Sequence, residues 1–120
     1  MEKPAPKFSD ELLEDIIEAI VERDGEQITS EDIKYIFGIK DSTANPITRS
    51  AIKEAIKKYA IPQGIEIGAC SSGYFLIKTD EERSAYVRNL TKRAIGIMER
   101  IQMVVDAAQM GGNNERETKD

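Results

Sequence analysis

The sequence contains no histidine and only one cysteine, Cys70, among its 120 residues. These absences exclude histidine general bases, histidine–cysteine zinc sites, cysteine–histidine dyads and an internal disulfide. The acidic residues form no cluster such as D-x-D-x-D-G, and no G-x-x-x-x-G-K-[ST] phosphate loop is present. Only carboxylate chemistry is left, so we expect a protein that is not an enzyme and that needs no metal ion or cofactor.

The sequence also lacks long apolar runs. The longest, such as residues 74–77, fall far short of the roughly 20 residues that a bilayer-spanning helix needs. Residues 1–7 contain no apolar stretch that could serve as a signal sequence. The content of 40% apolar and 32% charged residues is that of a soluble globular protein, and 120 residues fit one domain. We therefore expect a cytoplasmic protein with no membrane partner.

Basic residues are fewer than acidic residues in the chain as a whole, but not in every segment of it. The formal net charge is −5, which is unusual for a protein that binds phosphates. Residues 1–32 hold eleven acidic and three basic residues, whereas residues 33–79 hold three acidic and seven basic ones. Because a charged partner responds to the local field of the surface that it meets, the middle segment is the candidate surface for a polyanion. A solvated helix face is the alternative interpretation of these basic residues.

Two amphipathic helices are predicted in the first third of the chain. Ser9 is a good N-cap, and the apolar residues that follow recur with the spacing of one helical face, which predicts a helix over about 10–24. Thr29 or the serine after it can cap a short second helix over about 30–37, which Gly38 can end. The outer face of the first helix is strongly acidic. We expect it to be solvated surface, with docking of a basic partner as the lesser alternative.

A basic helix and a hairpin follow. A third helix over about 47–60, capped by Asn45 or Thr48, combines an apolar stripe with an opposite face rich in basic and hydroxyl side chains. Proline and glycine then break the helix. Two short strands at 66–69 and 74–77, joined by a polar turn, predict a β-hairpin.

Helix, short helix, basic helix and hairpin, in this order, predict a winged helix-turn-helix fold that is mainly α with a small β-hairpin. In such domains the N-terminal residues of the third helix contact base edges in the major groove. A guanidinium in the first turn of that helix can address guanine in a bidentate way, and the hairpin, about 66–77, can reach the backbone or minor groove. The residues that we expect to contact double-stranded DNA are Thr48, Arg49, Ser50, Lys53, Lys57, Lys58, Ser71 and Ser72.

The sequence of this region resembles that of a known family. The run T-R-S-A-I-K-E-A-I-K-K-Y at 48–59, I-E-I at 65–67 and S-G-Y-F-L at 72–76 resemble the helix and wing of the biotin-ligase-repressor type of N-terminal helix-turn-helix domain. In that family a serine–arginine pair opens the recognition helix and a G-Y-x-L strand closes the wing. The whole layout is also similar to small uncharacterised winged-helix proteins of bacteriophages and prophages. The resemblance implies DNA binding, and it implies no biotin chemistry because nothing here matches the ligase domain.

The chain departs from this family in the connection before the third helix. The family joins its second and third helices by a tight turn of three or four residues, whereas about nine residues separate Gly38 from Thr48 here. A longer connection can change how the third helix is presented. The departure therefore bears on the base-reading role of Arg49 more than on the fold.

One long helix is predicted over about 80–110. Thr79 and Glu82 match a capping box, and no proline follows up to Gly111. From Val87 to Ala108, apolar residues recur at alternating intervals of three and four residues, as in a helix that pairs with another helix. Met98 and Val105 widen this apolar stripe. Because a domain of about 70 residues has too little surface to cover a helix of some 45 Å, we expect a homodimer, parallel or antiparallel. The expected dimerisation residues are Val87, Leu90, Ala94, Ile97, Met98, Ile101, Val104, Val105 and Ala108.

The sequence thus predicts a flexible N-terminus (1–8), a winged helix-turn-helix domain (9–79), a dimerisation helix (80–110) and a disordered tail (111–120). The leading hypothesis is a phage or bacterial transcriptional regulator that binds operator DNA as a homodimer. The alternative is a protein-interaction or replication-accessory adaptor that docks its winged helix or its acidic first helix on a protein partner.

Overall fold

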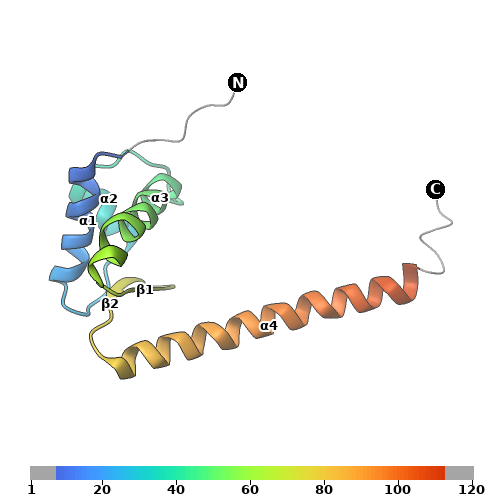
Figure 1. Cartoon of the computed structure of the whole chain (residues 1–120). Helices are drawn as coiled ribbons and strands as arrows, with labels where there is room; N and C mark the ends of the chain where they lie inside the picture. Colours follow the sequence, from blue (N-terminus) through green and yellow to red (C-terminus); the bar gives the residue numbers. More distant parts are fainter. Residues whose placement is uncertain (1–7, 113–120) are drawn as a thin grey trace. The chain divides into compact units, whose positions relative to one another are not determined.

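The computed structural model describes residues 8–112, which divide into two compact units between Thr79 and Asp80 (Figure 1). The chain is mainly helical, with one antiparallel hairpin and one long C-terminal helix, as predicted. The first unit contains α1 (Asp10–Glu22), α2 (Ser30–Phe37), α3 (Pro46–Ala55), the π-helical turn η1 (Ile56–Ala60), the 3₁₀ turn η2 (Ile61–Gln63), β1 (Ile67–Cys70) and β2 (Gly73–Leu76). The second unit is α4 (Asp80–Gly112).

The first two helices begin at the capping signals in the sequence, and α2 also ends at one, whereas α1 ends at Glu22, two residues before the predicted boundary. The Ser9 hydroxyl accepts a hydrogen bond from the Leu12 amide at 3.1 Å, so it caps α1 as predicted. In α2, Thr29 Oγ1 accepts from the Asp32 amide at 2.9 Å, and the Asp32 carboxylate accepts from the Thr29 amide at 3.2 Å. Gly38, at φ 62°, ends this helix in the left-handed conformation. Local capping therefore accounts for the starts of both helices and for the end of α2.

Both ends of α3 differ from the prediction of one helix over about 47–60, because the α-helix spans Pro46–Ala55 and a π-helical turn, η1, follows it. The helix begins at Pro46, and Asn45 is its N-cap residue in the left-handed conformation, but the Asn45 side chain makes no capping hydrogen bond. The first turn of α3 is capped instead by Asp41, whose carboxylate accepts a hydrogen bond from the Thr48 amide at 2.6 Å. Asp41 lies seven residues before Thr48 in the connection between α2 and α3, whereas capping patterns in a sequence are recognised only among residues within one turn of the helix start.

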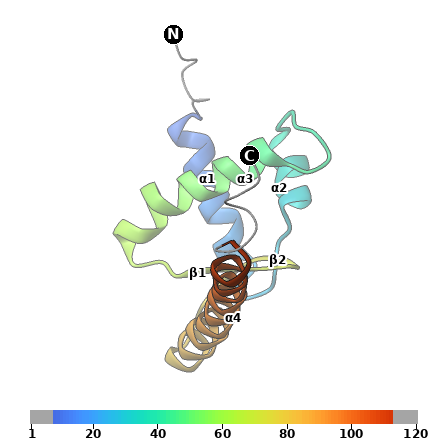
Figure 2. The same ribbon diagram turned by 90° about the vertical axis from the view of Figure 1, so that its right-hand side faces the viewer.

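The core lies where the three helices of the first unit pack together. In Figure 2, α3 crosses α1, and it also contacts α2. Each fully buried aliphatic side chain contributes about 1.5–3 kcal/mol to folding. Because α3 turns its apolar stripe toward this core, its opposite face is left at the surface. The large apolar side chains that are completely buried are Leu13, Ile16, Ile20, Ile28, Ile33 and Ile52.

The hairpin is tighter than predicted and is anchored to the helices. Cys70 pairs with Gly73, so the turn consists of Ser71 and Ser72 alone. An isolated β-bridge joins Tyr74 of β2 to Ile28, which precedes α2. Its two hydrogen bonds, from the Ile28 amide to the Tyr74 carbonyl at 2.9 Å and from the Tyr74 amide to the Ile28 carbonyl at 2.8 Å, fix the hairpin against the N-terminus of α2.

The boundaries at the two ends of the described chain also need correction. Phe8 was expected in the flexible N-terminus, but its side chain packs against the core of the first unit. The predicted tail began at 111, whereas α4 continues to Gly112. Residues 1–7 and 113–120, on which the rest of these two predictions fall, lie outside the described range. Within residues 8–112, no helix is both long and apolar enough for a membrane span.

Candidate nucleic-acid interface

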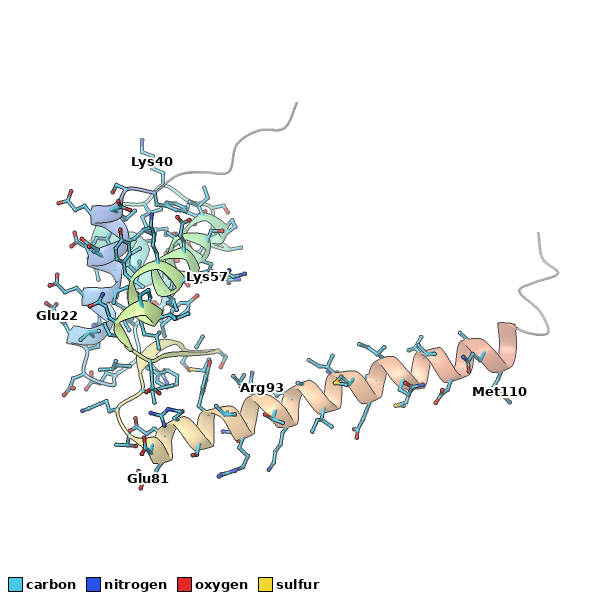
Figure 3. The ribbon with its side chains drawn as sticks, in the orientation of Figure 1. Glu22, Lys40, Lys57, Glu81, Arg93 and Met110 are labelled. Carbon is cyan, nitrogen blue, oxygen red and sulfur yellow. The ribbon has the colours of Figure 1, made fainter. Side chains whose placement is uncertain are left out.

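The outer face of α3 and of the η1 turn that follows it presents a row of cations. Arg49, Lys53 and Lys57 follow one another at intervals of four residues, and all three are exposed. Residues four apart in a helix are neighbours on its surface, so the three side chains form one stripe. Figure 3 shows Lys57, which lies in η1, projecting on the side away from α1. The buried residues of α3 lie on the opposite face, which is why the cations cannot turn inward.

A groove joins the start of this stripe to the hairpin tip. Arg49, Ser71 and Ser72 lie on its wall together with the first residues of α2, and its volume is about 410 Å³. No acidic side chain lies among the described residues that line it. Its charge is therefore that of one guanidinium surrounded by hydroxyl groups and backbone. The lining residues are Thr29, Ser30, Arg49, Ala69, Cys70, Ser71, Ser72, Gly73 and Tyr74.

Sequence reasoning missed part of this groove. Thr29 and Ser30 were considered only as helix caps, yet both line this groove together with Arg49 and Cys70. They reach it because Tyr74 pairs with Ile28 and so draws the hairpin to the N-terminus of α2. No local pattern reveals a bridge between segments more than forty residues apart.

Thr48 was expected at the interface, and this expectation is wrong. Its side chain is completely buried, and Thr48 Oγ1 donates a hydrogen bond to Asp41 Oδ2 at 2.8 Å. Burial by itself raises the pKa of Asp41, but the hydrogen bonds from the amide and hydroxyl of Thr48 and from the Ser42 amide outweigh it and lower that pKa. Thr48 therefore anchors the first turn of α3 instead of facing a ligand. Ser50, two residues later, is exposed but does not line the groove.

Lys58 faces a different neighbour from Lys57. Its ammonium pairs with the Asp10 carboxylate at 3.0 Å, which ties η1 to the start of α1. A hydrogen bond from Tyr59 and then the bond and charge of Lys58 lower the pKa of Asp10. In return, the hydrogen bond to Asp10, followed by burial and nearby negative charge, raises the pKa of Tyr59 to about 12. The charge of Lys58 is thus already partly balanced within the chain.

The long connection before α3 is held to α2 by side chains. Eight residues, 38–45, separate the two helices. At its end Asn45 Nδ2 donates to Glu31 Oε1 at 3.0 Å, and Lys34 pairs with the same carboxylate at 3.2 Å. The Asn45 hydrogen bond, then the Lys34 contact, lowers the pKa of Glu31. The connection therefore fixes the start of α3, and with it Arg49, instead of leaving it loose.

The predicted dimerisation residues of α4 are all at the surface. The nine side chains from Val87 to Ala108 are exposed, with Ile97 at 48% and Ile101 at 58% of their full accessible areas. Three further apolar side chains of this helix, Ile95, Met103 and Met110, are also exposed. The apolar stripe is therefore available to a partner.

Residues 8–112 contain no group of three or more histidine, cysteine, aspartate or glutamate side chains that could hold a metal ion. Comparison of the chain with known protein families, curated proteins and solved structures finds no match.

Proposed function

We propose that the first unit is a winged helix-turn-helix domain that binds double-stranded DNA, with α3 as the recognition helix and the hairpin as the wing. The observation that supports this proposal most directly is that Arg49 and the hairpin tip line one groove free of carboxylates, from which Lys53 of α3 and Lys57 of η1 continue the row of cations. DNA requires a positive surface with hydroxyl or amide donors beside it. The acidic residues that make the net charge negative are concentrated instead on α1.

The residues of this face have different roles in the proposal. Arg49, in the first turn of the helix, reads a guanine edge through two parallel hydrogen bonds. Lys53 and Lys57 lie one and two turns further on and contact phosphates without regard to sequence. Ser71 and Ser72 at the hairpin tip donate to the DNA backbone. Thr48 and Lys58 are left out, because the first is buried and the second pairs with Asp10.

We further propose that the protein acts as a homodimer through α4. The alternation of three and four residues from Val87 to Ala108 supports a helix-to-helix seam, and exposure of all nine side chains makes it available. Two DNA-binding units on one dimer fit a regulator that recognises paired half-sites, and each unit then adds to the overall affinity. A phage or bacterial transcriptional regulator is the function that these features support best.

The DNA proposal is tested by fluorescence anisotropy with random and genomic duplexes at about 50 and 200 mM salt. Arg49→Ala should weaken specific binding by about 1–3 kcal/mol. Lys57→Ala should reduce the slope of log affinity against log salt concentration by about one, the contribution of one phosphate contact. Lys58→Ala is the matched control, since it removes the same charge from the next residue, and it should have the smaller effect. Failure to bind at low salt, or equal effects of all three variants, contradicts the proposal.

The dimer is tested separately by sedimentation. Ile97→Glu places a charge in the seam and should give monomers. Ile95→Glu changes a side chain of nearly equal exposure, 50% against 48%, that lies off the seam, and it should leave the dimer intact. A monomeric parent chain, or dissociation of both variants alike, argues against pairing through this stripe.

A further inference from the structure

A second groove lies between α1 and α2, on the acidic part of the molecule. Its volume is about 520 Å³, and it shares no lining residue with the groove of Arg49. Ala19, Ile36 and Phe37 give it apolar surface, three carboxylates of α1 border it, and Arg23, which follows α1, also lines it. An apolar floor beside a mainly acidic border is typical of a surface that binds an amphipathic segment.

The apolar floor is open to solvent. Ile36 is 53% exposed and Tyr35, beside it in the sequence, is 77% exposed, although Ile33 of the same helix is completely buried. Helix α2 therefore presents apolar side chains on its outer face as well as toward the core. A partner that covered Ile36 would gain roughly 25 cal/mol for each Å² of apolar surface removed from water.

The carboxylates at the border are spaced for a helix. Asp15, Glu18 and Glu22 lie three and four residues apart, so they follow one line along α1. Within residues 8–112 these three side chains take part in no ion pair, whereas Asp10 of the same helix pairs with Lys58. Helix α1 contains six acidic and no basic residues, and like charges four apart destabilise a helix. A cationic partner would remove this repulsion.

We propose that the groove between α1 and α2 binds a basic amphipathic helix of a partner protein. The apolar side chains of that helix rest on Ala19, Ile36 and Phe37, and lysines or arginines on one edge, repeating every three or four residues, face Asp15, Glu18 and Glu22. This surface shares no lining residue with the groove of Arg49. The inference does not depend on DNA binding, because it rests on the shape and charge of this groove alone.

The test uses the full chain and two synthetic helical peptides of about 20 residues. Both have the same apolar stripe, but one carries lysine and the other glutamate along the edge of that stripe. We expect saturable binding of one lysine peptide per chain in calorimetry and no measurable binding of the glutamate peptide. Amide shifts in NMR spectra should include those of Ala19 and Phe37.

Three variants at exposed positions separate a specific groove from general charge attraction. Glu18→Lys should lower the affinity for the lysine peptide by about tenfold or more, and Ile36→Ser should lower that affinity by about fivefold or more. Glu11→Lys makes the same charge change on α1 outside the groove and should alter the affinity less than about threefold.

Three results would overturn the proposal. The first is equal binding of the two peptides. The second is an equal loss of affinity in Glu18→Lys and Glu11→Lys. The third is self-association of the parent chain that Glu18→Lys removes, because it would identify a second copy as the occupant. DNA affinity measured on the same variants should stay within about threefold of the parent, so failure of this inference is distinguishable from failure of the DNA proposal.

Discussion

Gly73, at the start of β2, is the position where a single added methyl group should disturb the hairpin most. Its φ of 135° is one that side-chain-bearing residues rarely adopt. A Cβ atom there would lie 2.5 Å from the Ile28 carbonyl oxygen and 2.9 Å from its carbon. Because both atoms are backbone, neither can rotate away. Gly73→Ala must therefore push β2 away from the segment before α2.

The expected cost follows from two effects. An alanine held in a sparsely populated backbone region costs about 1–3 kcal/mol. Separating the strands weakens the two hydrogen bonds between Ile28 and Tyr74, each of which contributes about 0.5–1.5 kcal/mol. We expect a total loss of about 2–6 kcal/mol, which is a large part of the roughly 5–15 kcal/mol that stabilises a typical domain. The groove that contains Arg49 should also lose its hairpin wall.

The control is Gly38→Ala. Gly38 also has a positive φ, 62°, but nothing lies within 4 Å of its added Cβ. The free energy of unfolding of this variant should therefore fall only by the conformational cost of the left-handed backbone, about 1–2 kcal/mol. Urea unfolding followed by circular dichroism compares the two variants, and NMR amide exchange at Tyr74 reports on the bridge itself. Equal destabilisation by the two substitutions, or unchanged protection of the Tyr74 amide, would refute the close approach of Gly73 to Ile28.

Three further predictions concern the rest of the chain. Thr48→Val removes the hydroxyl that donates to Asp41 at nearly constant volume, so it should lower the melting temperature. Ser50→Ala, which removes an exposed hydroxyl, should leave the melting temperature unchanged. Equal melting temperatures of the two variants would count against the Asp41 anchor. Because the pKa of Tyr59 is raised to about 12, its neutral phenol stabilises the fold fully below the ordinary pKa of 10.0, and this stabilisation is lost as the pH rises toward 12. An ultraviolet titration should show a late tyrosinate that disappears in Tyr59→Phe, and its persistence there would refute the assignment. Gly96→Ala should stabilise α4 by about 1 kcal/mol in thermal unfolding, since nothing lies within 4 Å of the added Cβ, and a loss of stability would mean that another chain packs closely there.

The division of charge along the chain matters more for function than its sum. Helix α1 carries six carboxylates, whereas the exposed stripe of α3 and η1 carries Arg49, Lys53 and Lys57. Two grooves of opposite character result, one bordered by α1 and the other by Arg49. At physiological salt, charges interact over roughly 8 Å, so each partner responds mainly to the groove that it enters. A net charge of −5 is therefore compatible with a DNA-binding face.

The sequence by itself determined the order of the elements and the caps at the start of the first two helices, because these depend on residues within one or two turns of each other. Ser9, Thr29 and Gly38 act where spacing places them, and the apolar period identifies the buried face of the helices of the first unit. The cationic stripe of α3 follows from the same periodicity. Local capping and helical geometry are short-range effects, and a single sequence contains all that they require.

Only the tertiary structure decided which residues share a surface. Thr48 turned from a candidate contact into a buried anchor because Asp41, seven residues earlier, folds back to it through the long connection. Arg49 came to share a groove with Ser71 because the hairpin pairs with Ile28 in front of α2. The first arrangement depends on the path of the connection before α3, and the second depends on contacts between segments that are distant in the sequence. The packing of the core, which no local pattern encodes, brings those segments together.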